Sequence, residues 1–331
     1  MNSTHSGPQT PPHTVLGVDI SKACFDAVLL LDSGQRRASR FDNNPTGFGQ
    51  LQRWLEAMHV GSVHVGLEAT GRYGLALACW LHEHHHWTSV LNPYRVKAYG
   101  TASGKRNKTD RADAELIAEF VQSQRPPAWQ PPSQEQARLQ ALVRRLEDVQ
   151  RLLHAEKNRL TQAAPAVAGS IQRLVRLLTA EVQTLLKHIR QCLDQDSMLQ
   201  RQSRLLCSIP GVAWLSAARV LAELPPPQQL RQARRAAALA GLHPRRHESG
   251  SSVRQASRLS KQGRRPLRAA LYMPALVARW RNPLLKAFAD RLATKGKSKK
   301  AVICAVMRKL LHIIFGILKH EKPFDPNYAT A

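Results

Sequence analysis

Val15-Leu16-Gly17-Val18-Asp19-Ile20 is a short apolar run that carries one acidic residue near its end. A run of this length, rich in β-branched residues, predicts a buried strand. Residues 25–31 form a second run of the same kind, and the turn signal Asp32-Ser33-Gly34 follows it directly. With a third strand near residues 39–42, the segment predicts a three-stranded meander at the start of the fold.

Helix-like and strand-like segments alternate after this meander, as far as about residue 127. We expect helices at residues 47–58, 75–85 and 112–122, and strands at residues 63–67 and 89–91, the second of them ended by Asn92-Pro93. Such alternation predicts an α/β domain with a mixed sheet. Pro126-Pro127 and Pro131-Pro132 then bracket a linker, after which the hydrophobic pattern is helical. The expected fold class is therefore α/β plus all-α.

Four domain-level segments follow from this pattern. Residues 1–13 are polar and Pro-rich and are expected to be a disordered tail, and residues 14–127 form the α/β domain. In residues 128–200 leucines recur with a seven-residue rhythm, which predicts a coiled-coil hairpin, serving either as a spacer within the chain or as an arm for dimerisation. Residues 201–326 are expected to form a helical C-terminal domain, with one of its helices at residues 267–280.

Ile209-Pro210-Gly211 joins two apolar helices in this last segment. The pattern is typical of a helix-hairpin-helix unit, in which backbone amides of the turn meet a DNA phosphate. The second glycine usual in such turns is replaced by Ala213, and a plain helical packing corner is the alternative interpretation.

Four acidic residues in separate motifs are the strongest sign of chemistry. Asp19 and Glu68 each follow an apolar strand-like run, and Asp110 and Asp113 lie three residues apart at the start of a helical pattern. A single aspartate at a strand end is often only a turn-former, but this combination predicts carboxylates that converge around a cation. Hard oxygen ligands suit Mg²⁺ (or Mn²⁺), and metal ions held in this way serve phosphoryl transfer.

The overall charge points to a polyanionic partner. Lys and Arg number 49 against 23 Asp and Glu, which gives a net charge of +26. Between residues 231 and 320 there are 22 Lys or Arg and only two acids, Glu248 and Asp290. We find no apolar run of membrane-spanning length and no signal peptide at the polar start, so a cytoplasmic, nucleoid-associated protein is expected. Five scattered cysteines show no disulfide or zinc spacing.

Residues 244–265 are expected to be a basic loop rich in Gly and Ser that lets the backbone approach a nucleic acid. A flexible surface loop that merely neutralises phosphate is the alternative, and composition does not say whether any of its serines is a nucleophile. The cluster His82 to His86, with Cys79, lies at a helix end without a second ligand pair and so gives little support to a zinc site. The basic residues expected to contact nucleic acid are Lys105, Arg106, Lys108, Arg245, Arg246, Arg254, Arg258 and Lys261.

The motifs around the four acids resemble those of the RuvC-like, RNase H-type domain of DEDD transposases. Gly17-Val18-Asp19, Glu68-Ala69-Thr70-Gly71 and Lys108-Thr109-Asp110-Arg111-Ala112-Asp113-Ala114 match in order. Farther along, Ile209-Pro210-Gly211, Ala240-Gly241-Leu242-His243-Pro244-Arg245 and Glu248-Ser249-Gly250 resemble the C-terminal domain of the same proteins. This is the "one-ten" family of insertion-sequence transposases, kin to the Piv-type DNA invertases, and its best-studied members are recombinases guided by a bridge RNA.

The resemblance implies roles for particular residues. Asp19, Glu68, Asp110 and Asp113 match the metal-binding carboxylates, and Ser249 matches the serine that attacks DNA and forms a phosphoserine link. It also implies DNA as donor and target, a guide RNA as partner, and a homo-oligomer (dimer or tetramer) whose sites are shared between subunits.

The resemblance thus implies a transposase-recombinase that cuts and rejoins DNA through Ser249 with the help of Mg²⁺. Two alternatives remain open at this point. A RuvC-like junction-resolving nuclease needs the acids but hydrolyses with water, and a catalytically silent RNA- or DNA-binding protein needs only the basic half of the chain.

Overall fold

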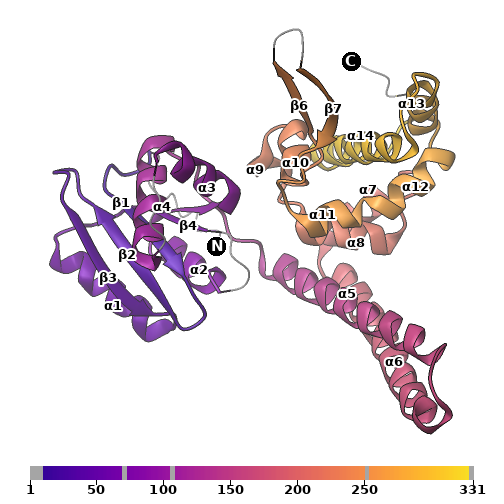
Figure 1. Cartoon of the computed structure of the whole chain (residues 1–331), viewed down its shortest axis with the longest axis horizontal. Coiled ribbons are helices and arrows are strands. Elements are labelled where there is room, and N and C mark those ends of the chain that lie inside the picture. Colours follow the sequence, from indigo (N-terminus) through magenta and orange to yellow (C-terminus); the bar gives the residue numbers. More distant parts are fainter. Residues whose placement is uncertain (1–9, 69–72, 105–108, 250–252, 328–331) are drawn as a thin grey trace. The chain divides into compact units, whose positions relative to one another are not determined.

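The computed structural model describes residues 10–68, 73–104, 109–249 and 253–327, and for residues 246–258 its description is limited to the backbone. The chain divides into two compact units, with the boundary between Pro131 and Pro132. In the first unit, shown in indigo to magenta in Figure 1, the elements are β1 (Val15–Ile20), β2 (Cys24–Leu30), β3 (Arg36–Asp42), α1 (Pro45–Ala57), β4 (His64–Glu68), α2 (Leu75–Glu83), β5 (Trp87–Leu91), α3 (Pro93–Ala102) and α4 (Asp110–Gln124).

The first unit is built on a five-stranded mixed sheet with the order β3-β2-β1-β4-β5. Strands β1, β2 and β3 form the antiparallel meander that the sequence predicts, and β4 and β5 run parallel to β1. The α/β class and the mixed sheet are therefore confirmed. The strand order is consistent with the RNase H-like interpretation.

Side-chain alternation along the strands gives the sheet two apolar faces. Leu16 and Val18 of β1 belong to the core that includes residues of α1 and α2. Val15, from the opposite face of the same strand, belongs to the core that includes residues of α3 and α4. Because residues two apart share a face, Gly17 and Asp19 lie on the α3–α4 side with Val15.

Helix α3 was not expected from the sequence. Asn92-Pro93 was interpreted as the end of a strand, but the Asn92 side chain accepts a hydrogen bond from Tyr94 N at 2.9 Å and Pro93 occupies the first helical turn. An amide cap followed by proline is a helix-start signal, and here it decides the structure.

The second unit is mostly helical and is shown in pink to yellow in Figure 1. Its elements are α5 (Gln134–Leu160), α6 (Pro165–Gln195), α7 (Ser197–Cys207), α8 (Trp214–Glu223), α9 (Pro227–Leu230), α10 (Ala233–Leu239), β6 (Pro244–Ser249), β7 (Val253–Leu259), α11 (Arg265–Ala270), α12 (Tyr272–Arg281), α13 (Pro283–Thr294) and α14 (Lys299–His320).

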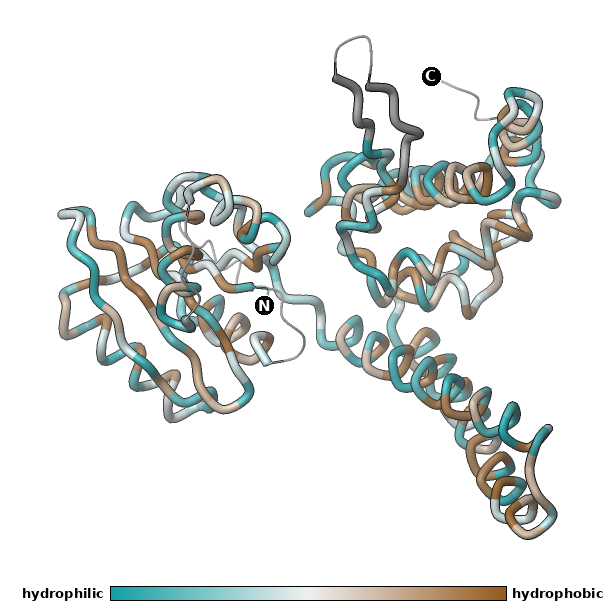
Figure 2. The backbone as a smooth tube through the Cα atoms, viewed as in Figure 1, coloured by the Kyte–Doolittle hydropathy of each residue, from teal (hydrophilic) through white to brown (hydrophobic). Residues whose placement is uncertain are grey.

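Helices α5 and α6 form the hairpin that the leucine rhythm predicts, with α6 beginning at Pro165. Figure 2 shows brown apolar residues along both helices, and the buried ones include Leu139 and Leu146 of α5 and Leu185 and Ile189 of α6. One continuous hydrophobic core runs from this hairpin through α14. The hairpin and the C-terminal helices therefore share a core within the second unit.

Two expectations for the C-terminal region were wrong. Residues 244–265 are not an irregular loop throughout, because β6 and β7 pair as an antiparallel hairpin with Pro244 opposite Leu259. The helix expected from residue 267 to residue 280 is divided at Leu271 into α11 and α12. Pro274 has no N–H to donate to the carbonyl of Ala270, four residues earlier, and its ring crowds that carbonyl, so a continuous helix is disfavoured there.

Among the residues that the structure describes, one helix, α14, is long and apolar enough to span a membrane by length and composition. Arg308 and Lys309 interrupt its apolar run, so no uninterrupted run of spanning length is visible in the sequence. The helix packs against α10, α12 and α13, and 56% of its most apolar window is buried inside the protein. This burial is typical of the central helix of a folded core.

Candidate active site

The first two acidic residues are brought together by the register of two parallel strands. Val18 of β1 lies opposite Leu67 of β4, so Asp19 and Glu68 are the next residues along their strands. Glu68 shares a face with Gly66, and Asp19 shares a face with Gly17. Both carboxylates therefore lie at the carboxyl ends of neighbouring strands, on the face that α4 covers.

Two glycines allow α4 to pack closely on this face. A Cβ on Gly17 would lie 2.1 Å from the carbonyl oxygen of Ala114, and a Cβ on Gly66 would lie 2.3 Å from a methyl group of Val121. At Gly17 only glycine fits this approach of helix backbone to strand, and at Gly66 a Cβ would displace the Val121 side chain. The amino-terminal turn of α4 is thereby held near the strand ends that carry Asp19 and Glu68.

Thr109 caps the start of α4 and thereby fixes the positions of the other two acids, Asp110 and Asp113. Its Oγ1 accepts a hydrogen bond from Ala112 N at 3.1 Å, and its carbonyl oxygen accepts one from Asp113 N at 2.8 Å. Asp110 and Asp113 therefore lie in the first turn, where the helix dipole favours negative charge. Asp110 is exposed and Asp113 is partly buried.

The electrostatics show that all four acids interact. Burial and the charges of Asp113, Asp110 and Asp26 raise the pKa of Asp19 to about 6. Burial and the charges of Asp19 and Asp113 raise the pKa of Glu68. The structure therefore brings the predicted residues into one acidic cluster, whose mutual repulsion favours a bound proton or cation.

The donor set of the acidic cluster fits a hard divalent cation, because every member offers carboxylate oxygens. As they stand, no three His, Cys, Asp or Glu side chains in the described parts of the chain are grouped closely enough to hold a metal ion. A cation would thus have to draw the carboxylates closer.

A fifth acid, Asp26, was missed by the sequence analysis. It lies directly opposite Asp19 in the antiparallel β1–β2 pair, so it shares the α4 face, and it contributes to the raised pKa of Asp19. Arg40 of β3 lies 3.9 Å from its carboxylate and donates to Cys24 Sγ at 2.7 Å. The sequence could have revealed this pairing, because in a tight hairpin two residues at equal distances from the turn lie opposite each other.

Ser249 and the basic residues lie on other segments. Ser249 is the last residue of β6, opposite Val253, in the second unit, whereas the four acids belong to the first. Arg245 and Lys261 are exposed. Lys105, Arg106 and Lys108 lie outside the described residues, as do Ala69-Thr70-Gly71, Ser251 and Ser252 and the side chains of Arg246, Ser249, Arg254 and Arg258.

The histidine cluster at the end of α2 makes local contacts. His84 stacks on Trp80 with ring centroids 3.9 Å apart, and its Nδ1 lies 2.8 Å from the Trp80 carbonyl oxygen. Burial lowers the pKa of His86 to about 4. These contacts account for His84 and His86 as packing residues.

Known proteins resemble this chain over nearly its whole length. Residues 16–167 match a family model for the DEDD transposases of the IS110 type. Residues 203–290 match a second family model, described as transposase of the IS116/IS110/IS902 family. The pilin gene-inverting protein of Moraxella bovis is 35% identical over 94% of this chain and 98% of its own length.

Two further relatives extend the comparison. The pilin gene-inverting protein of Moraxella lacunata has the same identity and coverage, and the transposase of insertion element IS1111A from Coxiella burnetii is 26% identical over 94% of this chain and 91% of its own length. Both compact units are covered by these matches, and the chain belongs to the IS116/IS110/IS902 family of transposases, enzymes of DNA recombination.

Proposed function

We propose that this transposase cuts and rejoins DNA by attack of Ser249 on a phosphodiester, assisted by Mg²⁺ or Mn²⁺ held by Asp19, Glu68, Asp110 and Asp113. The observation that carries the proposal is the acidic cluster at one edge of an otherwise basic protein. Carboxylates gathered in this way repel the phosphates of a nucleic acid unless a cation neutralises their charge. The family match agrees with this proposal.

The residues of the cluster have distinct tasks. When bound, the cation withdraws charge from the scissile phosphate and steadies the departing oxygen. Asp19 and Glu68 provide rigid oxygen ligands because they sit on adjacent strands, whereas Asp110 and Asp113 depend on the Thr109 cap for their position. Gly17 and Gly66 preserve the distance between the two pairs.

The serine step conserves the energy of the phosphodiester bond. Ser249 gives up its hydroxyl proton to water as its Oγ forms a bond to the scissile phosphorus. The bond from phosphorus to one deoxyribose oxygen breaks, and that oxygen takes a proton from water. That sugar leaves as a free hydroxyl. A hydroxyl of the exchanged strand then attacks the phosphoserine, which restores Ser249 and joins the new strand without ATP.

We further propose a homo-oligomer, either a dimer or a tetramer, with a guide RNA as its nucleic-acid partner besides DNA. The acidic cluster and Ser249 belong to different compact units, which suits a site completed by a second copy. The excess of basic residues between residues 231 and 320 suits several phosphate contacts at once.

Salt dependence tests the electrostatic part of this proposal. Each neutralised phosphate should steepen the plot of log affinity against log salt by about 0.7 for single strands and about 0.9 for duplexes. Fluorescence anisotropy with labelled RNA and DNA at several salt concentrations measures the slope. An affinity independent of salt would rule out the basic surface as the binding face.

Cleavage by neutral-amide variants tests the acidic part. Asp19→Asn and Glu68→Gln should lose strand cleavage in Mg²⁺ while still binding DNA, because the basic surface is unchanged. Asp32→Asn, in the turn at the opposite end of β1, is the matched control and should cleave normally. Normal cleavage by Asp19→Asn would refute the assignment.

A further inference from the structure

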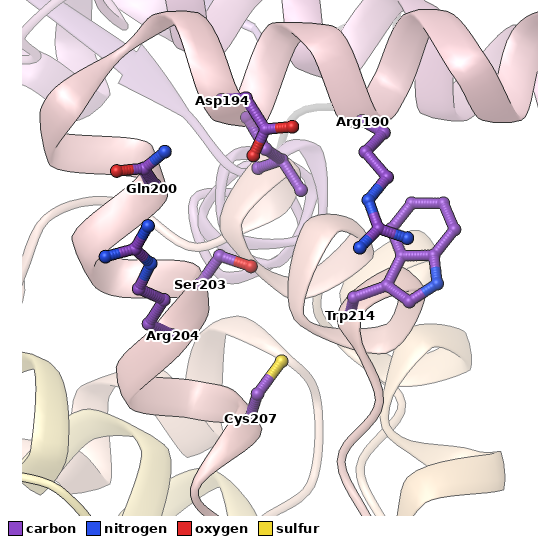
Figure 3. Close-up of a pocket in the computed structure, with 8 residues that line it drawn as sticks. Arg190, Asp194, Gln200, Ser203, Arg204, Cys207 and Trp214 are labelled. Atoms are coloured by element: carbon purple, nitrogen blue, oxygen red, sulfur yellow. The ribbon is translucent and has the colours of Figure 1, made fainter.

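A cavity of about 290 Å³ lies inside the second unit, between α6, α7 and the start of α8, and the proposed strand chemistry does not use it. Figure 3 shows that Arg190 and Asp194 come from α6, whereas Gln200, Ser203, Arg204 and Cys207 come from α7. The α7 residues recur at helical spacing, so they form one face of that helix. Trp214, the first residue of α8, closes the opposite side.

Flat surfaces dominate one side of the cavity. The guanidinium carbon of Arg190 lies 5.4 Å from the centroid of the Trp214 ring, which orders both groups through a cation–π contact. Trp214 is partly buried, so its ring is held in place and is still accessible. Indole and guanidinium planes are the surfaces on which unpaired bases stack.

The remaining walls offer charge and hydrogen-bonding groups. Arg190 and Arg204 are both exposed, and neither is paired with a carboxylate in the parts of the chain that the structure describes. The Gln200 amide and the Asp194 carboxylate can bond the edge of a base. Two guanidiniums against one carboxylate leave the cavity positive, which favours a phosphate-bearing ligand over a neutral or basic peptide.

The size of the cavity limits what it can hold. A volume near 290 Å³ is at the lower end of ligand pockets and suits one small planar group. A duplex, with its bases stacked and paired, has no base free to enter. We propose that the cavity receives one unpaired base of a nucleic-acid strand, stacked beside Trp214 and Arg190, with the adjoining phosphate bound by Arg204.

This proposal rests on the proposed function in one respect, that the chain binds nucleic acid. Cys207 provides a local reporter, because its thiol is exposed, lines the cavity and is hydrogen-bonded to Ser203. Site-resolved mass spectrometry can follow its alkylation by iodoacetamide with a short single-stranded RNA, a single-stranded DNA of the same sequence, or the duplex present. Cys304, which does not line the cavity, is the internal control.

Single strands should slow the alkylation of Cys207 and leave that of Cys304 unchanged, and the duplex should protect far less. Protection by RNA alone identifies a guide strand as the ligand, and protection by DNA alone identifies an opened DNA strand. Strong binding of single strands by anisotropy without protection of Cys207 would overturn the cavity proposal and leave the proposed function standing. Absence of any nucleic-acid binding would overturn both.

Variants give the second readout. Trp214→Ala should weaken single-strand binding about 5- to 150-fold, the range for loss of one aromatic stacking contact, and Trp214→Phe should retain most of the affinity. Arg204→Ala, at an exposed position that the core does not need, should reduce the salt slope for single strands by about 0.7. Trp280→Ala is the matched control, because Trp280 also carries a stacked arginine, Arg279, but lies outside the cavity.

The Trp280→Ala variant should leave Cys207 protection intact. Unchanged affinity and unchanged Cys207 protection in both Trp214→Ala and Arg204→Ala, combined with an unchanged salt slope in Arg204→Ala, would overturn the proposal.

Discussion

The acidic cluster should make the metal-free protein less stable than a variant that lacks one of its charges. In Asp19→Asn the amide keeps the size of the side chain and removes the charge that burial and the neighbouring Asp113 and Asp110 disfavour. A rise in pKa from 3.8 to about 6 corresponds to about 3 kcal/mol. Because Asp19 is partly exposed, solvent screening reduces this to about 1 kcal/mol.

The sign of the pH dependence follows from the direction of the shift. The folded-state pKa of Asp19 lies above that of the unfolded chain, so the folded protein prefers the neutral carboxyl. The destabilisation is therefore absent below about pH 4, grows as the pH rises through about 6 and is complete above it. Asp19→Asn should gain stability over the wild type at pH 8 and lose that advantage at pH 4.

Differential scanning calorimetry in EDTA measures the effect. A gain of about 1 kcal/mol should raise the unfolding temperature of a unit of this size by roughly 3–6 °C. Addition of Mg²⁺ should stabilise the wild type, by about 2.7 kcal/mol at a concentration 100-fold above Kd, and should stabilise Asp19→Asn much less. Asp32→Asn, which keeps an acceptor for the Thr14 hydroxyl, should match the wild type throughout. A destabilised Asp19→Asn protein at pH 8 would show that the charge of Asp19 does not weaken the metal-free fold.

Two further substitutions test the framework that supports the sites. Gly17→Ala should destabilise the first unit by about 3 kcal/mol, because the new Cβ meets the Ala114 carbonyl of α4. The control Gly49→Ala, in open space on α1, should stabilise the unit by about 0.5–1 kcal/mol. Chemical denaturation measures both free energies of unfolding, and equal stability of the two variants would contradict the close packing. Arg144→Ala removes the partner 3.0 Å from the buried Glu223 and should cost about 2 kcal/mol, whereas Arg151→Ala, in an exposed pair, should cost less than about 0.5 kcal/mol in the same assay.

Local sequence patterns predicted the secondary-structure elements and the four acids, but not the features that depend on which segments pair or pack together. Asp19 and Glu68 were found because each follows an apolar strand, and Thr109 as a cap explains why Asp110 and Asp113 begin a helix. Asp26 was missed because its importance depends on pairing across β1 and β2, which is a property of the register and not of the local residues.

The C-terminal errors have similar causes. The β6–β7 hairpin was expected to be irregular because its strands are basic and polar rather than β-branched, and cross-strand pairing overrides that weak propensity. The break at Leu271 could have been read from Pro274, whereas the cavity beside Trp214 could not. Three helices form that cavity, and no spacing along the chain reveals which of their faces meet.

The chemical fate of the scissile phosphate distinguishes attack by Ser249 from attack by water. DNA is incubated with the protein and Mg²⁺ in water enriched in ¹⁸O, the reaction is stopped with denaturant, and peptides that carry nucleotide are sequenced by mass spectrometry. Attack by Ser249 should leave nucleotide on Ser249 and no ¹⁸O in the rejoined DNA. The nucleotide should be lost in Ser249→Ala but not in Ser251→Ala or Ser252→Ala. Cut DNA ends that carry ¹⁸O, with no nucleotide on any serine, would show attack by water and contradict attack by Ser249.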